Sequence, residues 1–191
     1  MKALFLLRHG LTAANVQRLY CGNTDLPLSP EGRCDAEALC ASRPLPEVGL
    51  YVSSGMLRAD ETLMLLTGHA PDLIVPELRE MDFGLFEMHG YDALKDVPEY
   101  QQWINDEIGS VFCPNGENQV CFYVRVRTGG KLLLNRPEDS AIVICHGGVI
   151  VHLMQTWFPG ENRHFYQWQP QACRGYRVSV RDRRPVAFMD I

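Results

Sequence analysis

The sequence has little that would suit a membrane protein or a nucleic-acid-binding protein. Its first apolar run, Ala3–Leu7, is too short for the core of a signal peptide or for a membrane span. The formal charge is only −5 over 191 residues, so neither nucleic acid nor an anionic membrane is expected as the main partner. No internal repeat or low-complexity tract divides the chain. We therefore expect a single domain over residues 1–191, with a partial lid from about residue 81 to 135.

The seven cysteines also lack the spacing of a metal site or a disulfide framework. Their number is odd, and no Cys-x-x-Cys pair occurs. We expect reduced thiols in a cytoplasmic protein, several of them serving as small apolar residues of the core. A zinc site is accordingly not expected.

What the sequence does contain is an alternation of short apolar runs and amphipathic stretches, which is typical of an α/β layer fold. Ser29-Pro30-Glu31 has the residues of a helix start, and Gly68 those of a helix end. The pattern predicts a three-layer α/β/α sandwich with a mainly parallel central sheet. The predicted strands are Ala3–Leu7, Leu50–Ser53, Leu73–Val75, Ala141–Cys145, Tyr176–Val180 and Val186–Met189; the predicted helices after Ser29 are Met56–Leu66, Pro98–Ile108, Glu117–Asn135 and Gly148–Phe158.

Two of the predicted strands end in nearly the same way. Ala3–Leu7 runs into Arg8-His9-Gly10, and Ala141–Cys145 runs into His146-Gly147-Gly148. A parallel sheet would bring both histidines to one edge, where ligands bind in open α/β sheets. The glycines that follow allow a sharp turn and a close approach of backbone N–H groups to a ligand. Two histidines in matching positions therefore favour a functional site.

Several blocks of sequence, in order along most of the chain, resemble the histidine phosphatase superfamily, also called phosphoglycerate-mutase-like. The resemblance begins at Leu7-Arg8-His9-Gly10, with Thr12 and Asn15 following. The later blocks are Leu26-Pro27-Leu28-Ser29-Pro30-Glu31-Gly32, Ser53-Ser54-Gly55-Met56-Leu57-Arg58-Ala59 with Thr62, Leu78-Arg79-Glu80-Met81-Asp82-Phe83-Gly84, and His146-Gly147-Gly148.

The resemblance implies a phosphatase that transfers a phosphoryl group to His9 and then hydrolyses the phosphohistidine. In that family the residues matching Arg8 and Arg58 hold the phosphoryl oxygens, as guanidinium groups do well. His146 is expected to stabilise the phosphoryl charge. Glu80 matches the general acid, which protonates the leaving group and later activates water. Because fixed cations can replace a metal in such a two-step transfer, no metal ion or other cofactor is expected.

Further substrate contacts are expected from Asn15, Thr12 and Gly147. The expected partner is a small phosphorylated metabolite, and the protein is expected to be a monomer or homodimer. Leu19-Tyr20-Cys21-Gly22 resembles the alpha-ribazole phosphatases within the family, which suggests alpha-ribazole 5'-phosphate as a substrate. Broad-specificity sugar-phosphate phosphatases look much the same here.

Two other functions remain open. A cofactor-dependent phosphoglycerate mutase uses the same histidine chemistry, but such enzymes carry paired arginines for the substrate carboxylate, and none appears between Glu80 and His146. A non-catalytic phosphate-binding module would have no need of a general acid.

Some residues depart from the family pattern or match no motif. Met88 stands where glycine is common after Phe86-Glu87, and Asn115-Gly116-Glu117-Asn118 replaces Gly-Gly-Glu-Ser. His89 is expected to be an exposed loop residue. His69, His152 and His164 are expected on the surface or in packing, and Phe165, Tyr166 and Trp168 are expected to pack rather than to line a pocket.

Overall fold

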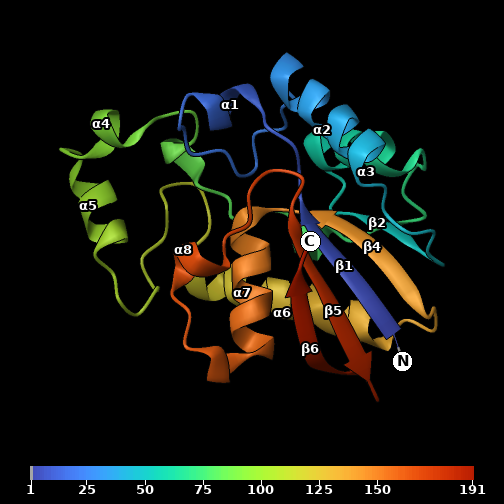
Figure 1. Ribbon diagram of the computed structural model, residues 1–191. Helices are drawn as coiled ribbons and strands as arrows, with labels where there is room; N and C mark the ends of the chain where they lie inside the picture. Colours follow the sequence, from blue (N-terminus) through green and yellow to red (C-terminus); the bar gives the residue numbers. More distant parts are fainter. Residues whose placement is uncertain (1) are drawn as a thin grey trace.

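The computed structural model describes residues 2–191, and in this range six strands form one sheet (Figure 1). The strands are β1 (Lys2–Arg8), β2 (Tyr51–Ser53), β3 (Leu73–Ile74), β4 (Ser140–Cys145), β5 (Gly175–Arg181) and β6 (Arg184–Asp190). Their order is β3-β2-β4-β1-β5-β6. The first four are parallel, and β5 and β6 add an antiparallel edge. The predicted mainly parallel α/β sheet is confirmed.

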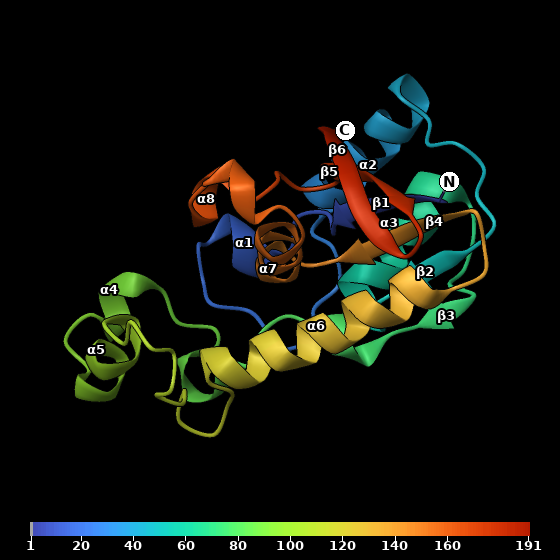
Figure 2. The same ribbon diagram turned by 90° about the horizontal axis from the view of Figure 1, so that it is seen from below.

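Helices cover both faces of this sheet. On β1, Leu4 and Leu6 belong to one buried cluster with side chains of α6 (Gln119–Asn135) and α7 (Gly147–Trp157). The alternate residues Phe5 and Leu7 belong to a second cluster with α2 (Pro30–Ser42) and α3 (Leu57–Thr67). Successive residues of a strand point to opposite faces, so an all-apolar strand such as β1 requires a helical layer on each side. Figures 1 and 2 show these two layers.

The predicted helix signals operate as expected. Ser29 caps α2 by accepting a hydrogen bond from the N–H of Gly32 at 3.1 Å, and Pro30 occupies the first turn. Gly68 ends α3 in the left-handed conformation, with φ 74°.

The polar turn between β5 and β6 contains Asp182 and Arg183, both at positive φ.

Helix α6 forms where the sequence predicts a helix over Glu117–Asn135, although it contains Gly129 and Gly130, which have low helix propensity. A Cβ at residue 129 would lie 2.8 Å from Leu78 Cδ2, and one at residue 130 would lie 2.7 Å from Leu153 Cδ2. The two glycines therefore let α6 approach η1 (Pro76–Leu78) and α7 closely, and this packing offsets their low helix propensity.

A small group of elements stands to one side of the sheet, as Figure 1 shows. It consists of η2 (Gly84–Phe86), α4 (Tyr91–Leu94) and α5 (Pro98–Ile104). Helix α5 ends earlier than predicted because Asp106 accepts backbone hydrogen bonds from Ile108 and Val111 and starts a turn. Helix α6, the last part of the stretch 81–135 predicted as a partial lid, belongs to the helical layer over the sheet; the lid itself stays a prediction.

The remaining short elements are α1 (Ala13–Val16), η3 (Pro159–Glu161) and α8 (Phe165–Trp168), none of which the sequence pattern predicted. Within residues 2–191, the helices are all too short or too polar to cross a membrane.

Candidate active site

The two strand-end histidines lie side by side. Strands β1 and β4 are parallel neighbours with Arg8 opposite Cys145, and the N–H of His9 donates to the carbonyl of Cys145 at 3.0 Å. The imidazole centroids of His9 and His146 are 5.1 Å apart, with an interplanar angle of 60°. The sheet register thus brings the two rings to the same edge, as the matching strand ends indicated.

The His9 ring is held in one tautomer. Its Nδ1 lies 2.6 Å from the carbonyl oxygen of Gly10, and a carbonyl can only accept, so Nδ1 carries the proton. The lone pair is then on Nε2. Burial, and next the positive charge of Arg58, lower the pKa of His9 well below its ordinary 6.5. His9 is therefore a neutral imidazole with Nε2 free to attack an electrophile.

His146 is fully buried at the N-cap of α7. Its Nε2 lies 2.9 Å from Ser54 Oγ, and its Nδ1 has no hydrogen-bond partner among residues 2–191. Burial, followed by the charge of Arg58, also lowers the pKa of this imidazole well below 6.5. A Cβ at residue 147 would lie 2.9 Å from Gln169 Nε2 and 3.5 Å from Arg8 Nε, so the glycine after His146 leaves room for these side chains.

Arg58 is buried in the first turn of α3 and is held by the loop before α2. Its Nη1 donates to the carbonyl of Thr24 at 3.0 Å and its Nη2 to that of Gly22 at 2.7 Å. Its Nε has no partner within residues 2–191. Its positive charge contributes to lowering the pKa of both histidines. Arg58 is not among the residues that line the cavity beside His9.

The loop that holds Arg58 is itself held by Glu87, for which the sequence suggested no role. The carboxylate of Glu87 accepts hydrogen bonds from the N–H groups of Asn23 and Thr24, each at 2.6 Å, and from the hydroxyl of Thr24. It also accepts from the N–H of Phe83 at 3.3 Å. Only the recurrence of an aromatic-Glu pair in the family could have drawn attention to this residue.

Glu80 lies across from the histidines, between two backbone donors. Its Oε2 accepts from the N–H of Gly148 at 2.9 Å, and its Oε1 from that of Met81 at 3.1 Å. A Cβ at residue 148 would lie 2.5 Å from Oε1, so only glycine leaves room for the carboxylate in this position. Gly148 therefore both donates its N–H to the Glu80 carboxylate and leaves room for it.

Arg125 of α6 holds the backbone of the Glu80 segment. Its Nη1 donates to the carbonyls of Glu77 at 3.0 Å and Arg79 at 2.9 Å, and its Nη2 to that of Glu80 at 3.2 Å. The same guanidinium forms an ion pair with Glu117 at 2.6 Å. The sequence predicted neither partner of this pair as a site residue. No spacing rule links them to Glu80, because the contacts are made by backbone carbonyls.

A cavity of about 450 Å³ opens beside these groups. Arg8, His9, Glu80 and Gly147 line it, and Arg8 is steadied by a hydrogen bond to the carbonyl of Pro170 at 3.1 Å. Among residues 2–191, no group of three or more His, Cys, Asp or Glu side chains is arranged to hold a metal ion.

The two remaining predicted contact residues form a local unit. Asn15 lines the cavity, but its Oδ1 accepts hydrogen bonds from the N–H and the hydroxyl of Thr12, both at 3.0 Å. Thr12 is fully buried as the N-cap of α1. The structure therefore places Thr12 as a support for Asn15.

Three residues expected only in packing or on the surface line the cavity: His152, Phe165 and Tyr166. Trp168 packs as expected, against Tyr176 and Phe188. A helical pattern starting at Gly148 could have found His152, because Gly148, His152 and Gln155 are three or four residues apart along α7 and share the side that lines the cavity. His89 is exposed, as expected.

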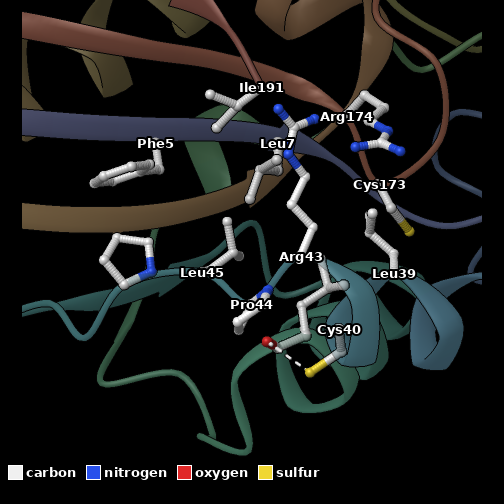
Figure 3. A pocket seen from close by; sticks show the side chains of 12 residues that line it. Phe5, Leu7, Leu39, Cys40, Arg43, Pro44, Leu45, Cys173, Arg174 and Ile191 are labelled. Carbon is white, nitrogen blue, oxygen red and sulfur yellow. Dashed lines mark hydrogen bonds between the residues drawn. The ribbon is translucent and has the colours of Figure 1, made fainter.

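A second cavity, of about 150 Å³, lies on the α2–α3 side of the sheet (Figure 3). Phe5 and Leu7 of β1 form one wall, Leu39 and Cys40 of α2 the other, and Cys40 donates to the carbonyl of Leu66. Its lining residues within the described chain include neither a histidine nor a carboxylate side chain. The first cavity, which is lined by both His9 and Glu80, is therefore the candidate phosphoryl site.

Comparison with known proteins identifies the family of the chain. The family model of the histidine phosphatase superfamily (branch 1) matches residues 4–188. The adenosylcobalamin/alpha-ribazole phosphatase of Escherichia coli K12 is 35% identical over 152 residues, covering 77% of this chain and 74% of that protein. A protein of Enterobacter sp. strain 638 named "Probable phosphoglycerate mutase GpmB" is 28% identical and covers 82% of this chain and 74% of its own. The crystal structure of the alpha-ribazole phosphatase from Shigella flexneri superposes with a TM-score of 0.83 at 28% identity, over 96% of this chain and 93% of that one.

Proposed function

The chain belongs to the histidine phosphatase superfamily, and from this we propose that it hydrolyses small phosphomonoesters through a phosphohistidine on His9, without a metal ion. One observation carries the proposal. Neutral His9, with Nδ1 bonded to Gly10 and Nε2 free, lies 5.1 Å from His146 between centroids, at a cavity that also contains Glu80.

In the first step, His9 Nε2 attacks phosphorus in line with the ester oxygen. The N–P bond forms as the P–O bond to the alcohol breaks, and Glu80 donates a proton to the departing oxygen. Arg8 and Arg58 supply positive charge to the phosphoryl oxygens, and His146 stabilises them by hydrogen bonding. Charge neutralisation by fixed donors lowers the barrier because they need no reorganisation as the transition state forms.

In the second step, water replaces the alcohol. Glu80, now a carboxylate, accepts a proton from the water as its oxygen bonds to phosphorus. The N–P bond breaks and releases inorganic phosphate and neutral His9. Gly147, which has no side chain, lets the backbone contact the phosphoryl group. Asn15, held by Thr12, contacts the substrate through its side-chain amide at the cavity wall.

The alcohol part of the substrate is proposed to be that of alpha-ribazole 5'-phosphate. The support is the name and 35% identity of the Escherichia coli relative. A mutase is the second candidate, because some relatives have that name. It is less well supported: among the described residues that line the cavity, Arg8 is the single permanent cation, and a phosphoglycerate carboxylate would need another.

All seven cysteines are unpaired, which supports the proposal of a reducing, cytoplasmic environment. A monomer or homodimer is proposed for the assembly.

The test is a screen of phosphomonoesters with and without EDTA, including alpha-ribazole 5'-phosphate, phosphoserine, sugar phosphates and 3-phosphoglycerate. We expect phosphate release that the chelator leaves unchanged, and an acid-labile label on His9 after rapid quench. His9→Ala should abolish turnover. Isomerisation of phosphoglycerate without net phosphate release would favour the mutase, and inactivity across the panel would favour a phosphate-binding module.

A further inference from the structure

Seven of the described residues that line the cavity beside His9 are Phe, Tyr or Trp, and we refer to this cavity as the aromatic chamber. These seven residues come from five separate parts of the chain. They are Tyr20, Phe83, Trp103, Phe122, Tyr123, Phe165 and Tyr166.

The first wall joins the loop after α1 to the lid. The ring centroids of Tyr20 and Phe83 are 5.1 Å apart, and those of Tyr20 and Trp103 are 5.8 Å apart. The hydroxyl groups of Tyr20 and Tyr100 are hydrogen-bonded at 2.7 Å. These edge-to-face and tilted contacts hold the rings in place before any ligand binds.

The second wall is a flat stack between α6 and α7. The rings of Tyr123 and His152 are parallel within 1°, with centroids 3.9 Å apart. Burial lowers the pKa of His152 to about 4, with a smaller contribution from the charge of Arg127, so the imidazole is neutral near pH 7. This wall therefore offers aromatic surface without charge.

The third wall, on α8, faces solvent. Phe165 is 40% exposed and Tyr166 is 78% exposed, and their ring centroids are 5.4 Å apart. Rings exposed at the mouth of a cavity keep apolar surface in contact with water. A ligand that covers them removes this surface from water, which is favourable.

The charges in the aromatic chamber lie at one end only. Among the described lining residues, Arg8 is the single permanent cation and Glu80 the single carboxylic acid, both beside the phosphoryl site. The other polar groups include amides such as Gln119, Gln155 and Gln169 and the hydroxyls of the lining tyrosines. A carboxylate on the leaving group would be desolvated against rings without a counter-ion, which is unfavourable. Hydroxyl groups could be satisfied by the amides.

We propose that the aromatic chamber is the leaving-group subsite and that it selects uncharged alcohols bearing a planar ring over alcohols bearing a carboxylate. This inference rests on the proposed phosphatase function. It assigns Tyr123 and Tyr166 a role in substrate choice, Tyr123 as a stacking surface and Tyr166 as a cover at the mouth.

The test compares inosine 5'-phosphate with ribose 5-phosphate, which have the same primary-alcohol leaving group and differ by the planar base. We expect kcat/KM to be about tenfold or more higher for the ring-bearing ester. O-phosphoserine and 3-phosphoglycerate should be the poorest substrates. Equal values for the matched pair, or faster turnover of either carboxylate ester, would overturn the proposal.

Two variants locate the preference within the chamber. Tyr123→Leu and Tyr166→Ala should each reduce the ratio of kcat/KM between the matched esters several-fold, up to about tenfold. Tyr166 is mostly exposed, so its variant is expected to fold even if Tyr123→Leu does not. Tyr91→Leu is the control, since Tyr91 is an exposed lid residue outside the chamber lining. An unchanged ratio in a folded Tyr166→Ala protein would count against the subsite.

Binding without turnover separates the inference from the proposed function. Calorimetry should detect binding of inosine, the product alcohol, and weaker binding in Tyr166→Ala. If no ester is hydrolysed yet inosine binds, the phosphatase proposal fails and the subsite stands. If phosphate is released but inosine does not bind, the subsite proposal is wrong.

Discussion

Glu87 and Arg58 hold opposite sides of one short loop. The carboxylate of Glu87 accepts the N–H groups of Asn23 and Thr24, while the guanidinium of Arg58 donates to the carbonyls of Gly22 and Thr24. Residues 22–24 therefore connect Glu87 to Arg58. If Arg58 binds the phosphoryl oxygens as proposed, Glu87 influences phosphate binding although it does not line the cavity beside His9.

We predict that Glu87→Gln weakens the phosphoryl site. An amide replaces one acceptor oxygen by a donor, which then faces the loop N–H groups, and a charge-assisted hydrogen bond is worth about 1.5–3 kcal/mol. The inhibition constant of inorganic phosphate should rise about tenfold, with KM rising more than kcat falls. Glu99→Gln, which alters an exposed carboxylate of α5, is the matched control.

A double variant tests whether the effect passes through Arg58. If Glu87 acts by positioning Arg58, then adding Glu87→Gln to Arg58→Lys should cost much less than it does in the parent. Fully additive effects, or an unchanged phosphate inhibition constant in folded Glu87→Gln protein, would disprove the coupling.

The Arg125–Glu117 pair should affect proton transfer by Glu80 rather than phosphate binding. Arg125 donates hydrogen bonds to three backbone carbonyls of the Glu80 segment, those of Glu77, Arg79 and Glu80. Arg125→Gln should displace Glu80 and slow turnover of alkyl phosphates by about 10–100-fold, within the usual range for a general acid. Activated aryl esters need less protonation and should be slowed less.

The control for Arg125→Gln is Arg127→Gln, which removes a cation from the same helix. The Arg127 side chain donates to the carbonyl of Tyr123 within α6 itself. Leaving-group dependence is measured as a Brønsted plot for aryl and alkyl phosphates. A variant that slows all esters equally would show that Arg125 supports the fold rather than the acid.

Gly148 should be intolerant of a side chain for a local reason. A Cβ there would lie 2.5 Å from Glu80 Oε1, and the carboxylate is the part that can move. Gly148→Ala is therefore expected to fold with nearly normal thermal stability but to lose about 10–100-fold in kcat on alkyl esters. Gly160→Ala is the comparison, since a Cβ at residue 160 would meet nothing within 4 Å. Normal kcat in Gly148→Ala would show that Glu80 acts equally well from another position.

The sequence predicted the parts of this site that follow from strand ends and local glycines. His9 and His146 each terminate a short, fully apolar strand, and such a strand must be buried in a sheet. Their proximity then follows from parallel pairing, which the β1–β4 register confirms. Ser29-Pro30 and Gly68 are local helix signals and set the ends of α2 and α3 in the same way.

The supporting residues could not be predicted because their contacts are not local. Glu87 binds a loop 63 residues earlier, and Arg125 binds backbone carbonyls 45 to 48 residues earlier. Backbone partners leave no residue-type signature. Gly129 and Gly130 have low helix propensity, and their close packing against Leu78 and Leu153 explains why glycine stands at these two positions of the helix.

The buried neutral histidines make folding stability depend on pH, and the sign can be derived. Burial, with the charge of Arg58, lowers the pKa of both His9 and His146 well below 6.5 in the folded protein. In the unfolded chain both should titrate near about 6.5. Above that pH both states are neutral and the pair has no effect. Below it the unfolded chain binds protons that the folded protein does not, so stability falls as pH decreases from 6.5 toward the folded-state pKa values.

His9→Gln should therefore flatten this dependence. Each histidine that is neutral when folded and protonated when unfolded contributes a slope of up to about 1.4 kcal/mol per pH unit. Urea denaturation between pH 4.5 and 7.5 should show a shallower acid slope for His9→Gln than for the parent protein. Carboxylates such as Glu138, whose pKa the Arg136 hydrogen bond lowers, add to the slope in both proteins and cancel in the comparison. His89→Gln, which removes an exposed imidazole, should keep the parent slope. Identical slopes for all three proteins would mean that the folded and unfolded states bind equal numbers of protons at His9, and would contradict a lowered pKa of His9 in the folded protein.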